Sequence, residues 1–197
     1  MAKNTKSFTG LKGFKFAVVG SEDVVEVEDL KGLQEISVSK EQSIEKAYAD
    51  NGVVEMAVSN GIVELSSTFH HIPLEQRTTL FGLTTDADGL SYVGNNAIPP
   101  YVNVMFEKTK EDGAVEYVGL LNGKFLYPED EGQTKGEDVE FGQMESSAEF
   151  MGSEVEGLEG VQTIILGLDE KGETKARDSI YKKLFGKAHP DATPVTP

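Results

Sequence analysis

The stretch YADNGVVEMAVSNGIVELSSTF, residues 48–69, is the clearest indication of the architecture of this chain. In its second half, apolar and polar side chains alternate with a period of two. Val63, Leu65 and Phe69 fall on one face of the expected strand, and the polar side chains between them fall on the other. A period of two is typical of a strand with one buried face. The stretch therefore predicts a β-strand within an antiparallel sheet.

Similar runs recur along the chain, and they are separated by Asn-Gly and Asp-Gly pairs. These pairs tolerate the positive φ angles of tight hairpin turns. They are Asn51-Gly52, Asn60-Gly61, Asp88-Gly89, Asp112-Gly113 and Asn122-Gly123. Residues 116–130 are expected to form two strands about the last pair, and residues 139–145 and 146–151 two more. The protein is predicted to be mainly antiparallel β.

Two segments are predicted to be helical. Residues 73–81 begin with a proline, which suits the first turn of a helix, and they are followed by Gly82. Residues 175–185 have lysines near their end, where the helix dipole favours cations. The residues expected to share one face are Leu74, Thr78 and Phe81 in the first helix, and Ile180, Tyr181 and Leu184 in the second.

The segment KEQSIEKAYADNGVVEMAVSN, residues 40–60, has a different character. It reads as two strands about a turn, but the contrast between its polar and apolar positions along the chain is weak. We therefore predict a long hairpin that leaves the body of the domain. Such a hairpin is poorly specified alone and suits ordering on a partner.

The charge and composition exclude several classes of protein. A net charge of −16 repels nucleic acid and anionic membranes instead of binding them. The chain has no cysteine, which excludes disulfides, Cys-ligated zinc and thiol catalysis. Its first residues, MAKNTKSFTG, lack the apolar segment of a secretory signal, and its longest apolar runs are too short to span a bilayer. We expect a soluble protein without a signal peptide.

Acids are concentrated between Glu129 and Glu159, where Lys135 is the one base. The simpler interpretation is a solvated face that keeps the protein soluble. The alternative is a surface that avoids adhesion to an anionic molecule. Both interpretations remain open at this level.

The cluster FHHIPLEQRTTLFG, residues 69–82, is the first candidate for chemistry. However, neighbouring residues on a strand point to opposite faces, so His70 and His71 cannot easily share a metal or a substrate. We interpret the cluster as a strand end that runs into the helix begun by Pro73. One imidazole is expected to be packed and the other exposed, with Glu75 and Arg77 on the exposed side of the helix.

The other short motifs lack residues that their chemistry requires. Residues 167–174, GLDEKGET, have the glycine spacing of a phosphate loop, but Glu173 stands where the phosphate-binding lysine belongs. Residues 86–89, DADG, lack the remaining ligands of a calcium loop and indicate a hairpin turn. No Gly-x-Ser-x-Gly elbow is present, and no acid pair is singled out. We predict no catalytic, cofactor-binding or metal-ligating residues and no enzyme.

The order of segments carries a resemblance. Pro100-Tyr101-Val102 is followed by YVGLLNGKF at 117–125 and by TKGEDVEF at 134–141. In this order the segments resemble the major tail protein, the tail tube subunit, of bacteriophages with long, non-contractile tails. The resemblance covers residues 10–151. Residues 1–9 would be an N-terminal arm, and residues 152–197 a C-terminal extension with the helix at 175–185 and a proline-rich arm.

The resemblance implies an antiparallel β-sandwich or flattened barrel with one flanking helix at 73–81 and a protruding hairpin at 40–60. Six copies would form a ring, and stacked rings would form a tube through which DNA is ejected without specific binding. The expected partners are further copies of the chain and other tail proteins, namely the tape measure, tail tip and terminator. The expected location is the virion tail, assembled in the host cytoplasm, with no membrane.

Two sets of site residues follow. An acidic lumen would repel phosphates, so some of seven acids are expected to face it. They are Glu35, Glu41, Glu45, Glu55, Glu64, Glu140 and Glu149. The residues expected to contact a neighbouring subunit through the hairpin are Ser43, Tyr48, Asn51, Gly52, Val54 and Met56.

Two other functions fit the same residues. A monomeric β-sandwich that binds or decorates a virion would use residues 40–60 as a recognition loop and would never polymerise. An acidic DNA mimic would need regularly spaced carboxylates and a basic target protein. An enzyme that uses two carboxylates ranks last, because no substrate is suggested.

Overall fold

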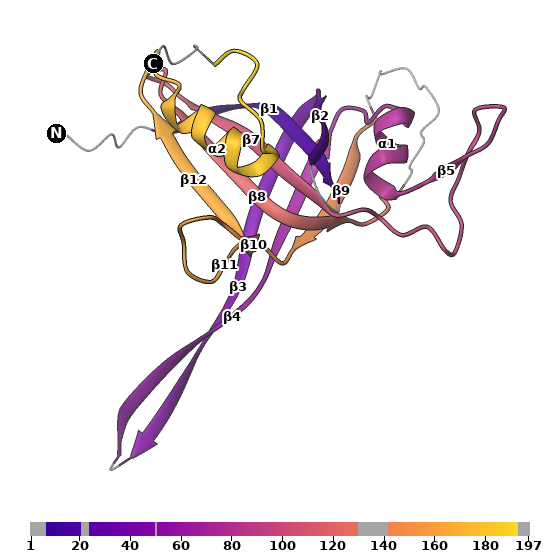
Figure 1. The fold of residues 1–197 in the computed structure, drawn as a ribbon. Helices are drawn as coiled ribbons and strands as arrows, with labels where there is room; N and C mark the ends of the chain where they lie inside the picture. Colours follow the sequence, from indigo (N-terminus) through magenta and orange to yellow (C-terminus); the bar gives the residue numbers. More distant parts are fainter. Residues whose placement is uncertain (1–6, 21–23, 50, 130–141, 193–197) are drawn as a thin grey trace, which may run out of the picture.

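The computed structural model describes residues 7–20, 24–49, 51–129 and 142–192. The fold is mainly β, with antiparallel pairing, as predicted (Figure 1). The strands are β1 (Phe8–Val19), β2 (Val24–Leu30), β3 (Leu33–Ala49), β4 (Gly52–Phe69), β5 (Thr84–Thr85), β6 (Ser91–Tyr92), β7 (Val102–Lys110), β8 (Val115–Phe125), β9 (Met144–Phe150), β10 (Ser153–Glu154), β11 (Val161–Gln162) and β12 (Ile164–Asp169). The helices are α1 (Leu74–Phe81) and α2 (Lys175–Phe185).

One sheet folds back on itself to make the two layers of a flattened barrel. Its strand order is β2-β1-β7-β8-β9-β4-β3, and β12 also pairs with β8. The first part of β8 pairs with β12, whereas Gly123 to Phe125 pair with β9. β8 therefore exchanges β12 for β9 as its neighbouring strand near Asn122, which has a φ of 58°. The first layer contains β2, β1, β7, β8 and β12, and the second contains β9, β4 and β3.

Phenylalanine side chains fill the space between the layers. Phe14 of β1 and Phe69 of β4 meet edge to face, with ring centroids 5.1 Å apart. Phe125 of β8 and Phe150 of β9 meet in the same way at the junction of the layers. Burial of one such side chain stabilises the fold by about 1.5–3 kcal/mol. The alternation predicted for Val63, Leu65 and Phe69 is confirmed, since all three are buried.

Helix α1 contributes the residues at its C-terminal end to this core. Leu80 and Phe81 are buried, and Gly82 ends the helix with a φ of 65°. The predicted face of Leu74, Thr78 and Phe81 is wrong, because Leu74 is 53% exposed. Only the last turn of α1 meets the core. Of the residues that precede it, Leu74 and Glu75 are exposed, Gln76 donates to β2, and Arg77 donates to the hydroxyl of Tyr127.

Helix α2 covers the outer face of the first layer. The predicted stripe of Ile180, Tyr181 and Leu184 is confirmed, and it packs in a second apolar cluster with Met105 and Leu121 of the sheet. The side chain of Asp169, at the end of β12, accepts the N–H groups of Ala176 and Arg177 at 2.8 and 3.0 Å. An acid in this position satisfies free N–H groups at the start of a helix.

Three of the five predicted turns reverse the chain. Asn51 lies between β3 and β4 and Gly52 begins β4, Asp88-Gly89 lies between β5 and β6, and Asp112-Gly113 lies between β7 and β8. The other two predictions are wrong, because β4 runs through Asn60-Gly61 and β8 runs through Asn122-Gly123. The pairing of β3 with β4 shifts between Lys40 and Gln42, opposite the first of these pairs. At both of these Asn-Gly pairs the strand continues, with a local irregularity in its pairing.

The strands predicted at 139–145 and 146–151 are also different. A single strand, β9, runs from Met144 to Phe150, and residues 139–141 lie outside the described part of the chain. The ends of the predicted terminal arms, residues 1–6 and 193–197, lie outside it as well. Among the described residues, no helix is long and apolar enough to cross a membrane.

Candidate assembly surfaces

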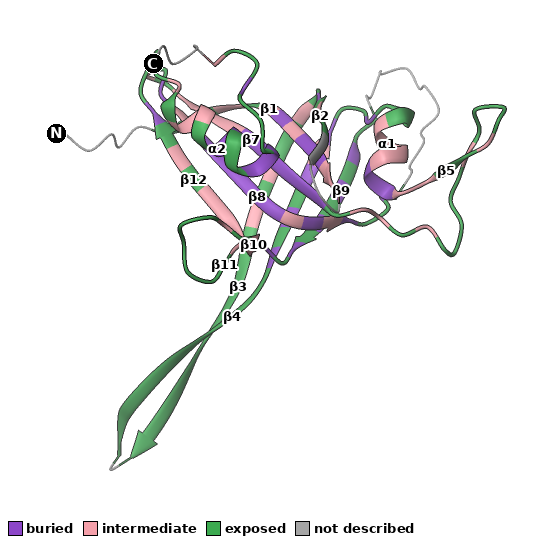
Figure 2. Ribbon diagram, in the orientation of Figure 1, coloured by how far each residue is buried: buried purple, intermediate pink, exposed green. Residues whose placement is uncertain are grey.

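The first surface is the projecting hairpin, which we define as residues 42–60 of β3 and β4. It extends away from the two-layered body as a two-stranded ribbon (Figure 1). All of its described residues are exposed (Figure 2). Pairing runs from Gln42 opposite Asn60 to Ala49 opposite Gly52. A two-stranded ribbon of this kind is at best marginally stable in water unless something packs against it.

Cross-strand pairing gives the projecting hairpin one apolar face. Ile44 is opposite Val58, Lys46 is opposite Met56, and Tyr48 is opposite Val53. Ile44, Tyr48 and Met56 are between 62% and 70% exposed. The pairs on the other face are small or polar: Ser43 with Ser59, Glu45 with Ala57, and Ala47 with Glu55. The contrast between polar and apolar side chains, which is weak along the sequence, is therefore clear between the two faces of the paired strands.

The six hairpin residues expected at an interface occupy different places. Tyr48 and Met56 lie on the apolar face, and Ser43 lies on the polar face. Asn51 and Gly52 are at the tip, and Val54 is the extra residue where the register shifts. The sequence singled out Tyr48 and Met56, but it missed Ile44 and Val58, whose common face only the cross-strand pairing reveals.

The second surface is the polar outer face of the second layer. Glu64 is directly opposite Glu149, Ser66 is opposite Ser147, and Thr68 is opposite Glu145. Glu35 of β3 is opposite Thr68 on its other side. The inner face of the same strands is buried. In the described part of the chain, α2 covers the outer face of the first layer, and no element covers this one.

The structure separates the predicted lumen-facing acids into groups. Glu35, Glu64 and Glu149 share the polar outer face of the second layer. Glu41, Glu45 and Glu55 belong to the hairpin or its base, and Glu140 lies outside the described residues. The sequence missed Glu145, although the period of two that selects Glu149 also selects it. Whether these acids face a lumen stays a prediction.

Lys124 borders this acidic face. It pairs across the strands with Glu149, but its ammonium group lies over the ring of Tyr101, 4.3 Å from the centroid. Part of the electrostatic interaction of the Lys124 ammonium is therefore with an aromatic ring. Glu35, Glu64, Glu145 and Glu149 outnumber Lys124, so the face keeps a net negative charge.

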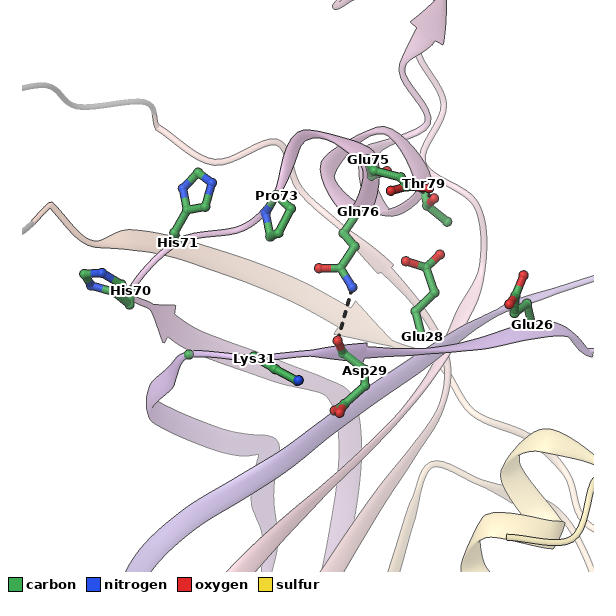
Figure 3. Close-up of a pocket in the computed structure, with 11 residues that line it drawn as sticks. Glu26, Glu28, Asp29, Lys31, His70, His71, Pro73, Glu75, Gln76 and Thr79 are labelled. Carbon is green, nitrogen blue, oxygen red and sulfur yellow. Dashed lines mark hydrogen bonds between the residues drawn. The ribbon is translucent and has the colours of Figure 1, made fainter. Parts of the chain in front are cut away.

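A groove between β2 and α1 contains the two histidines of the first candidate site (Figure 3). Both imidazoles are exposed, so the prediction that one is packed is wrong; Ile72, the next residue, fills the core position. At the other end of the groove, burial raises the pKa of Glu28, and the neighbouring Thr79 opposes this shift by hydrogen bonding. The Gln76 amide donates to the Asp29 carbonyl at 3.2 Å.

The groove holds about 820 Å³ and is open to solvent. Within the described ranges, no group of three or more histidine or acidic side chains is placed to hold a metal. The local contacts join a strand to a helix, which agrees with the structural interpretation of residues 69–82. The other two rejected motifs also have structural roles: Asp169 caps α2, and Asp86 closes the turn between β5 and β6.

Comparison with known proteins adds a likeness of shape. The fold is similar to the cryo-EM structure of the cap of an anti-feeding prophage, described as a tube-terminating cap. The TM-score is 0.45 and the identity is 9%, over 86% of this chain and 100% of that chain. No protein-family model and no curated protein matches the chain. A likeness this distant carries no conclusion about function.

Proposed function

We propose that this chain is a structural virion protein, the subunit of a phage tail tube. Six copies form a ring, rings stack into a tube in the host cytoplasm, and DNA leaves the virion through it. Other tail proteins cap and fill the tube. The observation that carries the proposal is that β3 and β4 combine two unusual surfaces, an apolar hairpin and an acidic sheet face, which none of the described residues cover.

The projecting hairpin supports self-assembly because its apolar face has no cover within the described chain. Ile44, Met56 and Val58 would each gain from removal from water, by about 25 cal/mol per Å² of apolar surface buried. Exposed apolar surface on a protruding ribbon is a liability in a protein that stays monomeric. Contact with a further copy removes this apolar surface from water and orders the ribbon.

The edges of the main sheet support a closed ring. β3 lies at one end of the strand order and β2 at the other. An edge strand presents unpaired N–H and C=O groups, and a barrel closed between subunits removes such edges. β3 contributes Glu35 to the acidic face, which continues over β4 and β9, so closure through β3 would place that face on the inside or the outside of the ring.

The acidic face supports a lumen through which DNA slides. Glu35, Glu64, Glu145 and Glu149 would repel backbone phosphates. A wall that repels DNA gives no binding sites at which transport would stall. The serine and threonine side chains between the acids keep the surface hydrated.

The test is negative-stain electron microscopy of the purified protein at high concentration. Wild type is expected to form hollow tubes or six-fold rings, and deletion of residues 42–58 is expected to abolish them. A finer pair of variants separates the two faces of the hairpin. Ile44→Asp on the apolar face should stop assembly, whereas Ser43→Asp on the polar face should not.

Two results would contradict different parts of the proposal, the role of the hairpin and the tube itself. Tubes formed by the deletion variant would show that the hairpin has no role in assembly. Monomers at every concentration, also after addition of preformed tail tips as an initiator, would reject the tube. That second result would favour the other function that suits an exposed apolar hairpin, a monomeric module that binds a virion surface.

A further inference from the structure

The turn between β5 and β6 forms a second projecting surface, which we call the 84–93 loop. Asp86 holds it in one conformation. Its carboxylate accepts the N–H groups of Asp88 and Leu90 at 3.0 and 2.9 Å, and the hydroxyl of Tyr92 donates to it at 2.6 Å. These hydrogen bonds lower the pKa of Asp86, so it is ionised at neutral pH. The loop is therefore ordered before any partner binds.

This ordered loop exposes apolar side chains. Leu90, Tyr92 and Val93 are between 51% and 58% exposed. Asp88 is exposed beside them, and its carboxylate has no hydrogen-bond or ion-pair partner among the described residues. The loop thus combines an apolar patch with one unpaired negative charge.

The apolar face of the projecting hairpin has the complementary composition. Lys46 is the one charged residue among the pairs on that face, and it stands between Ile44 and Tyr48 along β3. In the described chain, Lys46 has no ion-pair partner. Complementary charges within apolar contacts set the register and the choice of partner.

Another exposed apolar group, Leu166 and Leu168 on β12, fits the hairpin less well. The acid opposite Leu168 is Glu116, and its carboxylate is already within 3.8 Å of the Lys108 ammonium. It therefore offers Lys46 no free charge. The 84–93 loop offers both the apolar patch and the unpaired acid.

The hairpin and the loop project from the body in different directions (Figure 1). The two surfaces of one chain therefore cannot cover each other. A contact between different surfaces of identical chains is heterologous, and it generates a ring when it closes and a filament when it does not.

We propose that the apolar face of the projecting hairpin docks on the 84–93 loop of a second copy, with Lys46 beside Asp88. The inference rests on the proposed function, because it names the surface that receives the hairpin during assembly. The occupant is a second copy of this chain, since both complementary surfaces belong to it.

A charge exchange tests the contact in the full-length chain. Lys46→Glu and Asp88→Lys are each expected to raise the critical concentration for assembly, measured by sedimentation, at least about tenfold, which corresponds to about 1.4 kcal/mol. The double variant should assemble again near the wild-type concentration. Lys40→Glu and Glu170→Lys change exposed charges outside both surfaces and serve as matched controls.

Disulfide cross-linking gives an independent readout, because the chain contains no cysteine. Lys46→Cys combined with Asp88→Cys should give a ladder of linked chains on oxidation, which neither single variant should give. A ladder would support the docking even if no tubes form. No ladder and no rescue by the double charge variant would overturn it.

The two proposals can fail separately. If wild type forms tubes and the hairpin deletion abolishes them, but neither rescue nor a ladder is seen, the tube stands and this docking surface is wrong. If the ladder appears without tubes or rings, the docking stands and the tube is wrong. Monomers without cross-links would reject both.

Discussion

Glu64 on β4 and Glu149 on β9 are directly opposite each other on the exposed face of the second layer. Like charges in this position weaken a sheet. The opposite face of the same strands compensates, because Leu65 pairs with Ala148 in the core and the hydroxyls of Ser67 and Ser146 meet at 2.9 Å. The contacts on the buried face therefore maintain the pairing of β4 with β9 despite the repulsion between the two acids on the exposed face.

Removal of this repulsion should stabilise the subunit. Glu64→Gln, which removes the member of the pair whose other cross-strand neighbour is the uncharged Ser39, is expected to raise the free energy of unfolding by about 0.2–1 kcal/mol, measured by urea denaturation below the assembly concentration. The gain should shrink at high salt, because salt screens exposed charges. Glu45→Gln, which removes an exposed acid on the hairpin, is the control; an equal gain there would point to net charge and not to the pair.

The projecting hairpin should contribute almost nothing to the stability of the isolated subunit. Its side chains are exposed, so removal of residues 42–58 takes nothing from the core. We expect the free energy of unfolding to stay within about 0.5 kcal/mol of wild type, the usual range for surface changes. Thermal and urea denaturation measure this, and a large loss would show that the hairpin packs on its own body.

The junction of the two layers should be sensitive to a single methyl group. A Cβ at Gly123 would lie 2.3 Å from Cδ1 of Phe150, inside the core. Gly123→Ala is therefore expected to destabilise the fold by about 1–3 kcal/mol through overpacking. Gly142→Ala is the matched control, because a Cβ there meets no atom within 4 Å. Equal stability of the two variants would contradict the geometry.

His189 should make the C-terminal segment sensitive to pH. Its ring lies 4.8 Å from that of Tyr181, and its Nδ1 atom accepts the N–H of Asp191 at 3.1 Å. Burial, and then the charge of Arg177, lowers the pKa of His189 below its ordinary value of 6.5. A lowered pKa means that the fold prefers the neutral ring. Its contribution is complete above pH 6.5 and is lost as the pH falls from there through the lowered pKa.

Hydrogen exchange of residues 186–192, corrected for intrinsic rates, measures this loss. Protection in wild type is expected to fall from pH 7.5 to pH 5, whereas His189→Gln, which keeps an acceptor but does not titrate, should change less. His70→Gln removes an exposed histidine elsewhere and should behave like wild type. The same pH dependence in all three proteins would show that another group is responsible.

The two exposed histidines should be dispensable. His70→Asn and His71→Asn, made singly, are expected to leave folding and assembly largely intact, because neither imidazole is part of the core. Circular dichroism and electron microscopy measure the two properties. Complete loss of either one would require a role for the groove between β2 and α1 beyond joining strand to helix.

Local patterns predicted a large part of the fold. The alternation at Val63, Leu65 and Phe69 and the apolar stripe of α2 depend on periods of two and 3.6 residues, which any short window displays. The predictions were wrong where contacts with distant parts of the chain determine the local structure. Asn122-Gly123 has turn chemistry, yet pairing with β7 and β9 continues β8 through it, and the positive φ of Asn122 remains as a local irregularity in the strand. Leu74 has the right spacing for a buried face, but no core reaches it.

The amino-acid sequence was sufficient for the charge, the β class, the two helices and the existence of the hairpin, because these follow from composition and from interactions between near neighbours. It could not place Glu64 opposite Glu149, or Ile44 and Met56 on one face. Register between strands is selected by the packing of their buried faces, and a shift of one residue moves every side chain to the other face. Three-dimensional packing of the phenylalanine core therefore determined which acids share a surface and which apolar residues remain available to a second copy.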